Sequence, residues 1–341
     1  MILFTTLLIT LAANPVAWEV KRLAPIPDPE GFACPFAGIS HGTLLVAGGA
    51  NFPTKKPWEG GTKIWYDTVW ALDRPAGEWK KAGKLPRPLA YGVWADHHER
   101  VICAGGSDAD KHHSAVFSLE WKDGKINVNE LPALPRPIAN ACGTVVDAML
   151  YIAGGQEKPD STSALKAFYA LDLTAKDAKW RELDAWPGPG RILATAASFD
   201  GTFWLIGGTD LSPDKDGKAA RTYLKDVYRF HPKTGWTREA DLPCSIVAAP
   251  TPAAVDHRGI HLFGGDDGTN LGFQPPEKHP GFRKTALVYD PTTKAWKHGD
   301  ELPVARVTVP LIHWGDTWIM PNGERGPGVR SPDVWQFEPK P

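Results

Sequence analysis

The sequence has no strong excess of charge of either sign, and it has few residues of the kind that build cross-links or metal sites. Its 38 Lys and Arg residues nearly balance 39 Asp and Glu residues, so the net charge is −1. Nothing therefore points to nucleic acid or an anionic membrane surface as a partner. The four cysteines are poorly placed to pair, because most of them stand at similar points of separate repeats: Cys34, Cys103, Cys142 and Cys244. We expect neither a disulfide framework nor a cysteine metal site.

Helical periodicity is missing as well. No window of useful length repeats apolar residues every 3.6 positions without Gly or Pro, so very little helix is expected. By contrast, Gly (34), Pro (32) and Trp (15) are abundant. Many turns together with many large aromatics are typical of short strands joined by tight connections. The 341 residues exceed the usual size of one domain, but repeat architectures escape that limit by burying each unit against its neighbours.

The N-terminal segment resembles a secretory signal. Residues 1–13 are almost wholly apolar, interrupted only by threonines, and small residues and Pro15 follow them. The run is too short to span a bilayer, although no Lys or Arg precedes it as in most signal peptides. We therefore expect residues 1–17 to be a signal peptide, and the mature protein to be periplasmic or secreted with no membrane span. The alternative is a buried N-terminal strand.

An apolar run ending in a glycine pair recurs along the chain. The pairs are Gly48-Gly49, Gly105-Gly106, Gly154-Gly155, Gly207-Gly208 and Gly264-Gly265, and a sixth copy carries Asn322-Gly323. Successive copies lie 49 to 58 residues apart, which is roughly the period of a four-stranded Kelch blade. After each pair come a polar stretch, an aromatic-bearing strand and, in most units, a Trp strand followed by Leu-Pro or Trp-Pro.

The last repeat ends without its outer Trp strand. It begins near Arg306 and stops after Trp335 and Phe337, whereas residues 18–23 read Trp-Glu-Val-Lys-Arg-Leu and resemble the missing strand. Adding this strand to the last blade closes the ring and removes its open sheet edges. We therefore predict an all-β fold, a single six-bladed Kelch β-propeller over residues 18–341, whose last blade is closed by an N-terminal strand.

The residue directly after each glycine pair is expected to begin a loop at the central mouth of the ring. These residues are Ala50, Ser107, Gln156, Thr209, Asp266 and Glu324. The longest of the loops cover residues 51–66, 210–225 and 267–283. Long loops on a rigid ring are where function usually lies.

Three segments carry a more specific signal. Residues 36–50 contain Phe-Ala-Gly-Ile-Ser and Ala-Gly-Gly-Ala, residues 90–93 read Ala-Tyr-Gly-Val, and residues 322–330 read Asn-Gly-Glu followed by Pro-Gly-Val-Arg. In these segments the chain resembles the sialic acid mutarotase family (N-acetylneuraminate epimerases), Kelch propellers that interconvert the anomers of N-acetylneuraminate. The order is permuted, as in the cyclically permuted branch of that family. The last segment is the most specific, because Kelch glycines alone say little about function.

The resemblance implies catalytic roles for Glu324 and Arg330, and their chemistry suits those roles. Mutarotation needs a proton removed from the anomeric hydroxyl and one delivered to the ring oxygen, and a carboxylate is a plausible shuttle. A sugar acid also needs its carboxylate held, which Arg does best through two parallel hydrogen bonds. The alternative is an ion pair between Glu324 and Arg330 that only stiffens their loop.

Five further residues are candidates for substrate binding. Arg191 and Arg306 stand at the start of inner strands and can add positive potential for an anionic sugar. Tyr91 offers a stacking surface or a hydrogen bond, and Asn51 and Phe52 begin the longest loop of the first blade. The structural alternatives stay open: the arginines can bind loop backbone, and the others can be packing residues.

Neither a metal ion nor another cofactor is predicted. His97-His98 and His112-His113 are adjacent pairs, and neighbouring side chains on a strand or loop point apart. No carboxylate spacing supports either pair as ligands, so we interpret both as surface histidines.

Three functions remain open from the sequence. The first is an isomerase that speeds anomer exchange of N-acetylneuraminate or a related sugar acid, which would be its small-molecule partner. The second is a non-catalytic Kelch module that binds glycan or protein, which differs from the first only at Glu324 and Arg330. The third is a copper-radical oxidase, which needs two Tyr, two His and a cross-linked Cys that the sequence does not nominate. The sequence makes no prediction of oligomeric state.

Overall fold

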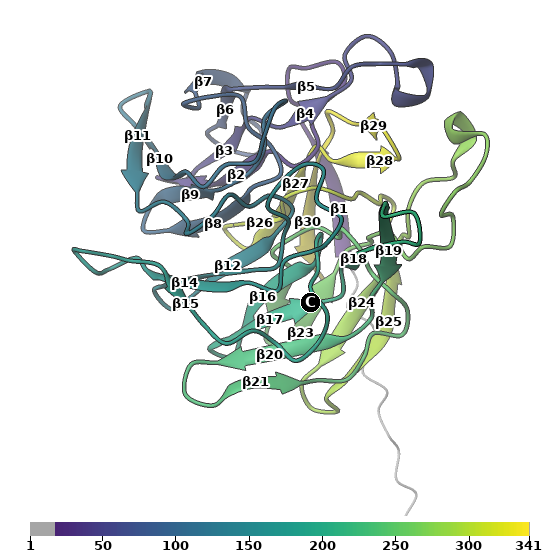
Figure 1. Cartoon of the computed structure of the whole chain (residues 1–341). Coiled ribbons are helices and arrows are strands. Elements are labelled where there is room, and N and C mark those ends of the chain that lie inside the picture. Colours follow the sequence, from purple (N-terminus) through teal and green to yellow (C-terminus); the bar gives the residue numbers. More distant parts are fainter. Residues whose placement is uncertain (1–17, 341) are drawn as a thin grey trace, which may run out of the picture.

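Six four-stranded antiparallel sheets form the body of the protein, and the computed structural model describes residues 18–340. Figure 1 shows the sheets following one another in chain order as the blades of a propeller. Two 3-10 helices, η1 (Pro57–Glu59) and η2 (Pro276–Lys278), are the helical elements of the described residues, and neither has the length to cross a membrane. The predicted all-β, six-bladed fold is confirmed. The signal peptide predicted for residues 1–17 lies outside the described residues.

In each of the first three blades, strands that follow one another along the chain are neighbours in the sheet. Blade 1 contains β2 (Phe36–Ser40), β3 (Thr43–Ala47), β6 (Thr68–Leu72) and β7 (Lys80–Lys84). Blade 2 contains β8 (Val93–His97), β9 (Arg100–Ala104), β10 (Val116–Lys122) and β11 (Lys125–Leu131). Blade 3 contains β12 (Cys142–Val146), β13 (Met149–Ala153), β14 (Phe168–Asp172) and β15 (Arg181–Glu182).

The remaining blades repeat the pattern. Blade 4 contains β16 (Thr195–Phe199), β17 (Thr202–Ile206), β20 (Val227–His231) and β21 (Gly235–Arg238). Blade 5 contains β22 (Ala254–Asp256), β23 (Gly259–Leu262), β24 (Thr285–Asp290) and β25 (Ala295–Glu301). Blade 6 contains β26 (Ile312–Trp314), β27 (Thr317–Pro321), β30 (Val334–Pro339) and, from the other end of the chain, β1 (Trp18–Leu23).

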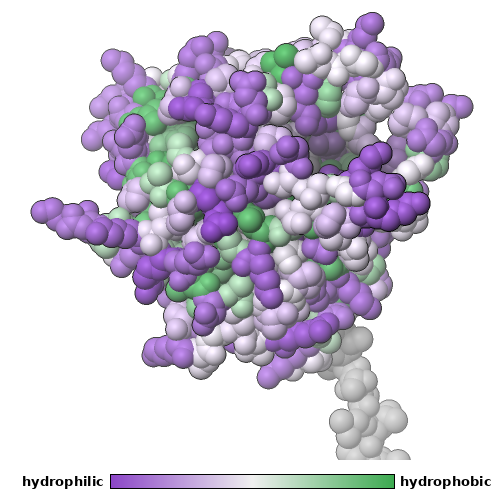
Figure 2. All heavy atoms as spheres, viewed as in Figure 1, coloured by the Kyte–Doolittle hydropathy of each residue, from purple (hydrophilic) through white to green (hydrophobic). Residues whose placement is uncertain are grey.

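Three short hairpins lie outside the blades, in the connections that follow the glycine pairs. They pair β4 (Ala50–Asn51) with β5 (Ile64–Trp65), β18 (Thr209–Pro213) with β19 (Ala219–Tyr223), and β28 (Glu324–Gly326) with β29 (Val329–Arg330). In Figure 1 these hairpins lie near one another beside the long loops. The surface in Figure 2 is mostly hydrophilic with small scattered hydrophobic areas, and its projecting loops are largely hydrophilic.

The N-terminal strand closes the ring as predicted. β1 pairs antiparallel with β30, from Trp18 opposite Pro339 to Leu23 opposite Val334. The Trp18 side chain turns inward, and its ring centroid lies 4.9 Å from Phe263 of blade 5 and 5.5 Å from Trp318 of blade 6. The strand therefore completes the sheet of blade 6 and also fills the space between two blades.

Among residues 18–340, six of the seven clusters of buried hydrophobic residues each lie between two neighbouring blades. The seventh is small and contains Val247, Ala248 and Val307. Strand β3 shows why: side chains alternate across a strand, so Leu45 packs toward blade 2 while Leu44 and Val46 pack toward blade 6. Each blade is therefore apolar on both faces and needs a neighbour on each side. This requirement makes a closed ring more favourable than an open stack.

The glycine pairs all adopt one backbone conformation. Both members of each pair have positive φ, for example 67° and 96° at Gly48 and Gly49. A Cβ atom on Gly48 would lie 2.3 Å from the Leu89 carbonyl oxygen, so no side chain fits there. The sixth copy keeps the conformation, with φ of 68° at Asn322, because Asn tolerates the left-handed region better than most residues.

A circle of backbone hydrogen bonds surrounds the propeller axis. We call it the inner belt; its residues are Cys34, Tyr91, Asn140, Leu193, Ala248 and Thr308. All six have φ between 43° and 63°, and each backbone N–H donates to the carbonyl of the belt residue in the neighbouring blade, at 2.7 to 3.1 Å. Cys34 donates to Thr308, which closes the circle. The belt fixes six side-chain positions around one axis.

Each residue before the belt pairs with the residue after a glycine pair. The pairs are Ala33 with Ala50, Ala90 with Ser107, Ala139 with Gln156, Ile192 with Thr209, Val247 with Asp266, and Val307 with Glu324. The six residues predicted to surround the mouth therefore occupy equivalent positions beside the inner belt.

Candidate active site

A cavity of about 700 Å³ opens at the mouth of the ring. Its lining includes five of the six belt residues: Tyr91, Asn140, Leu193, Ala248 and Thr308. Three of the residues that follow the glycine pairs also line it: Gln156, Asp266 and Glu324. Most of the remaining lining comes from the long loops at residues 51–66, 210–225 and 267–283. A volume of this size suits a small-molecule ligand.

Glu324 and Arg330 face each other across the β28–β29 hairpin and both line the cavity. Arg330 Nη2 lies 3.2 Å from Glu324 Oε1, and the Gly328 N–H donates to Glu324 Oε2 at 3.1 Å. The Pro-Gly turn at residues 327–328 thus allows both the hairpin and this backbone contact. The hairpin brings together the two residues that the sequence singles out.

Arg330 is almost fully buried, with 6% of its surface exposed. Its guanidinium carbon lies 4.9 Å from the centroid of the Phe52 ring, and its Nε and Nη1 atoms are buried without a hydrogen-bond partner among the described residues. Only Nη2 makes an ion pair, and its partner is Glu324. This geometry suits positioning of the Glu324 carboxylate better than a two-pronged grip on a ligand.

The Thr308 hydroxyl lies 3.2 Å from Glu324 Oε1 and 2.7 Å from the Val307 carbonyl oxygen. A hydroxyl carries one hydrogen, and the shorter contact takes it. The Thr308 oxygen can then accept a hydrogen bond from Glu324 when the carboxyl group is protonated. Thr308 is absent from the sequence-based candidates, although its place as the counterpart of Tyr91 in blade 6 could have identified it.

Tyr91 belongs to the inner belt and lines the cavity, so its position is compatible with the predicted contact to a ligand. Burial raises the pKa of its hydroxyl well above the usual range, and the positive charge of Arg330 counteracts part of that rise. The phenol therefore stays protonated and can donate a hydrogen bond.

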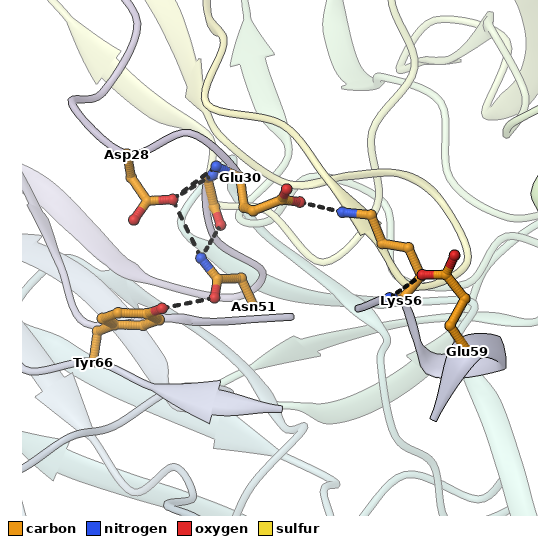
Figure 3. Close-up of polar contacts among 7 residues, drawn as sticks. Asp28, Glu30, Asn51, Lys56, Glu59 and Tyr66 are labelled. Carbon is orange, nitrogen blue, oxygen red and sulfur yellow. Dashed lines mark hydrogen bonds and ion pairs between the residues drawn. The ribbon is translucent and has the colours of Figure 1, made fainter. Parts of the chain in front are cut away.

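Asn51 and Phe52 lie behind the cavity wall rather than on it. Asn51 is fully buried, and its side chain donates to Asp28 Oδ1 at 3.2 Å and accepts from the Tyr66 hydroxyl at 2.8 Å, as Figure 3 shows. The Phe52 ring packs against the Arg330 guanidinium, which lies over its face. Neither residue is part of the cavity lining, so their positions favour supporting roles over direct contact with a ligand.

The two arginines predicted to bind substrate are also held away from the cavity. Arg191 is fully buried and forms two parallel hydrogen bonds with Asp226, at 3.0 and 2.9 Å. Arg306 is 7% exposed and donates to Asp333 and Ser331, both at 3.1 Å. These contacts correspond to the structural alternative stated above. The prediction of direct substrate contact gains no support from either position.

The interpretation of His112 and His113 as surface residues is wrong, because they are only 7% and 6% exposed. His113 contacts Asp108 at 2.6 Å, and His112 lines the cavity with Nδ1 3.1 Å from the Gln156 carbonyl oxygen. Of the other pair, His98 is exposed and His97 half-buried. Within residues 18–340, no group of three or more His, Cys, Asp and Glu side chains could hold a metal ion.

Two loop residues of the cavity were missed from the sequence. Lys63 precedes β5, and Tyr223 ends β19 with its hydroxyl donating to Asp266 Oδ2 at 2.7 Å. Both belong to loops whose length and sequence differ between blades, so the repeat pattern gives no signal for them.

Comparison with known proteins identifies the family. A family model described as N-acetylneuraminate epimerase matches residues 5–128 and 131–274. Curated relatives described as N-acetylneuraminate epimerase include those of Escherichia coli (strain K12), 29% identical over 237 residues, and Shigella sonnei (strain Ss046), 28% identical over 237 residues. Each alignment covers 62% of this chain and 61% of the relative, so the chain matches about three fifths of the relatives' length.

The fold has a solved counterpart. The structure of YjhT superposes with a TM-score of 0.69 at 15% sequence identity, covering 93% of this chain and 97% of that chain. At that identity the likeness concerns the fold alone. The family match ends before Glu324 and Arg330, so the roles of these two residues rest on the cavity geometry and on the sequence resemblance.

Proposed function

Because the chain belongs to the N-acetylneuraminate epimerase family, we propose that it accelerates the interconversion of the anomers of N-acetylneuraminate or a related sugar acid. The observation that carries this proposal is the Glu324 carboxylate, fixed by Arg330 and Gly328 at the wall of a cavity of about 700 Å³. The activity for which the relatives are named supplies the substrate class, and the geometry supplies a group that can transfer protons.

The reaction opens and recloses the sugar ring. Glu324 accepts the proton of the anomeric hydroxyl, the bond between the anomeric carbon and the ring oxygen breaks, and the ring oxygen takes up a proton to give the open-chain ketone. After rotation about the bond next to the ketone carbon, the hydroxyl formed from the ring oxygen adds to the other face of the ketone. It loses its proton, and the ketone oxygen takes up a proton to become the anomeric hydroxyl again. Each proton removed is given back, so the reaction needs no net donor or acceptor.

The hydrogen bonds of the Glu324 carboxylate leave it able to accept a proton from the sugar. A carboxylate offers about four lone-pair sites, and the donors Arg330 and Gly328 use two of them, one on each oxygen. The Thr308 oxygen lies beside Oε1 without donating to it, and one site on Oε2 remains free. Arg330 orients the carboxylate and places positive charge beside the oxygens of the reacting sugar, while Tyr91 supplies a neutral donor at the same wall.

Anomer exchange measured by NMR tests the proposal. We expect wild-type protein to speed exchange of N-acetylneuraminate at a pH where the spontaneous reaction is slow, and Glu324→Gln to reduce the acceleration by about 100-fold or more, the usual contribution of acid–base catalysis. Glu130→Gln is the matched control, because Glu130 lies exposed on the outer strand of blade 2. Circular dichroism verifies that all variants fold.

Either departure from this pattern is informative. Acceleration that survives in Glu324→Gln contradicts the role given to Glu324. Wild-type protein that binds the sugar without speeding exchange favours the alternative, a non-catalytic Kelch module that binds glycan.

We also propose that residues 1–17 are an export signal and that the mature protein is periplasmic or secreted. The support is the apolar N-terminal run together with the position of β1, which begins at Trp18 and is needed whole for ring closure. Expression of the full chain followed by N-terminal sequencing should give a mature end before Trp18. A mature protein that retains Met1 contradicts the proposal.

A further inference from the structure

Lys63 occupies an unusual position in the cavity wall. It lies just before β5, and its ammonium nitrogen is 5.1 Å from the centroid of the Tyr91 ring, 5.4 Å from that of Trp65 and 5.8 Å from that of Phe52. Aromatic faces attract cations, so three of them hold the ammonium group at a fixed place. The residue lines the cavity beside Arg330 and Glu324.

No carboxylate of the described residues forms an ion pair with Lys63, and no hydrogen bond to its ammonium group occurs among them. Burial and the positive charge of Arg330 lower the pKa of Lys63, while the negative charges of Glu324 and, when ionised, Cys34 act in the opposite direction. The whole cavity is lined by three cations (Lys63, Arg221 and Arg330) and three carboxylates (Asp108, Asp266 and Glu324). The charged groups that act on Lys63 are Arg330 and Glu324, so this part of the wall places two cations beside one carboxylate. An anionic ligand bound here would relieve the local excess of positive charge.

The other cations at the cavity are less suited to hold a ligand's carboxylate. Arg330 uses Nη2 for Glu324, and its Nε and Nη1 are covered. Arg221 also lines the cavity but is exposed, on β19. Lys63 alone among these three combines partial burial, a fixed position and a free set of hydrogen-bond donors.

We propose that Lys63 binds the carboxylate of the sugar acid and is the residue that selects acids over neutral sugars. This inference rests on the proposed function, which it deepens by naming the group that recognises the substrate's charge. It also divides the labour at the site: Lys63 holds the carboxylate of the substrate, and Arg330 holds the carboxylate of Glu324.

The test compares N-acetylneuraminate with its C1 methyl ester, which keeps the anomeric hydroxyl and loses the charge. Calorimetry measures binding of both to wild type, Lys63→Met, Lys63→Gln and Lys63→Arg. Lys55→Met is the matched control: Lys55 is exposed in the same loop as Lys63, and its substitution removes the same charge. NMR measures anomer exchange of the same proteins.

Wild type should bind the acid at least about tenfold more tightly than the ester, as expected for a lost charge-assisted contact. Lys63→Met and Lys63→Gln should lose that preference by weakening the acid alone, Lys63→Arg should keep most of it, and Lys55→Met should keep all of it. In exchange kinetics KM for the acid should rise with little change in kcat, because the carboxylate is held equally in substrate and transition state.

Three results overturn the inference: acid binding by the neutral Lys63 variants as tight as that of wild type, equal weakening of acid and ester, or equal losses in the Lys63 and Lys55 variants. In each case wild-type acceleration of exchange leaves the proposed function standing. Conversely, binding of the acid that depends on Lys63 without any acceleration of exchange upholds the inference and contradicts the proposed function.

Discussion

Replacing Trp18 by alanine measures what the N-terminal strand contributes to the closed ring. The side chain is 8% exposed and packs edge-on against Phe263 and Trp318. Burying a tryptophan removes about 150–250 Å² from water, which corresponds to about 4–6 kcal/mol at about 25 cal/mol per Å². Trp-to-Ala substitutions in protein cores cost about 3–5 kcal/mol. We therefore expect Trp18→Ala to lower the free energy of unfolding by about 3–5 kcal/mol.

Chemical denaturation followed by circular dichroism provides the measurement. Glu19→Ala is the control on the same strand: the Glu19 side chain is half exposed and its carboxylate forms a surface ion pair with Lys21, so little change is expected. A loss below about 1 kcal/mol for Trp18→Ala, within the range of ordinary surface substitutions and their errors, would refute the reasoning. It would mean that the Trp18 side chain is not packed between blades 5 and 6 in solution.

Two further predictions follow from buried or partly buried charges. Arg191→Met should lower the free energy of unfolding by about 3–5 kcal/mol, because it leaves the Asp226 carboxylate buried without its ion-pair partner. Chemical denaturation measures this change. Unchanged stability together with weakened sugar binding would contradict the structural role and favour Arg191 as a ligand contact. As the pH rises, binding of N-acetylneuraminate should begin to weaken at a lower pH than it would with a lysine of ordinary pKa. The reason is that the lowered pKa of Lys63 makes its ammonium group lose its proton at a lower pH. In Lys63→Arg this alkaline weakening should move to higher pH, and a binding profile that is identical in the two proteins would contradict the assignment.

The architecture was predictable because each blade is encoded by one copy of a sequence repeat. Two successive positive φ values beside a neighbouring carbonyl strongly favour glycine, so a glycine pair marks five of the six repeats and Asn322-Gly323 marks the sixth. The closing strand was predictable by counting: the last repeat lacked an outer strand, and residues 18–23 had the matching pattern. Both inferences depend on local sequence and on the number of blades, which the chain displays directly.

The side-chain assignments were less predictable, because they depend on contacts between distant segments. Arg191 and Arg306 precede inner strands, where a residue that lines the mouth is expected. Instead, Arg191 forms an ion pair with Asp226 and Arg306 forms one with Asp333, both behind the cavity wall. His112 and His113 are polar residues in a loop, yet packing of that loop against Gln156 and Asp108 buries them. The position of Lys63 could not be predicted from the sequence, because it depends on a loop conformation that places the ammonium group near the rings of Phe52, Trp65 and Tyr91.

The framework explains which positions can differ between blades. The inner belt residues are joined through backbone atoms, so the belt places few demands on their side chains beyond tolerance of positive φ. The adjacent positions after the glycine pairs are likewise held by the backbone, and two of them carry carboxylates, Asp266 and Glu324.

These two carboxylates show that the loops, rather than the ring, decide the chemistry. Asp266 accepts hydrogen bonds from the Tyr223 hydroxyl and the Gly268 N–H, so its neighbours are neutral donors. Glu324, at the equivalent position one blade later, is paired with the Arg330 guanidinium and lies on the same wall as the Lys63 ammonium group. A ligand that carries its own negative charge is therefore favoured on the Glu324 side of the cavity and disfavoured near Asp266. The same backbone position thus supports opposite preferences, and an anionic sugar should enter with its carboxylate directed toward blades 1 and 6.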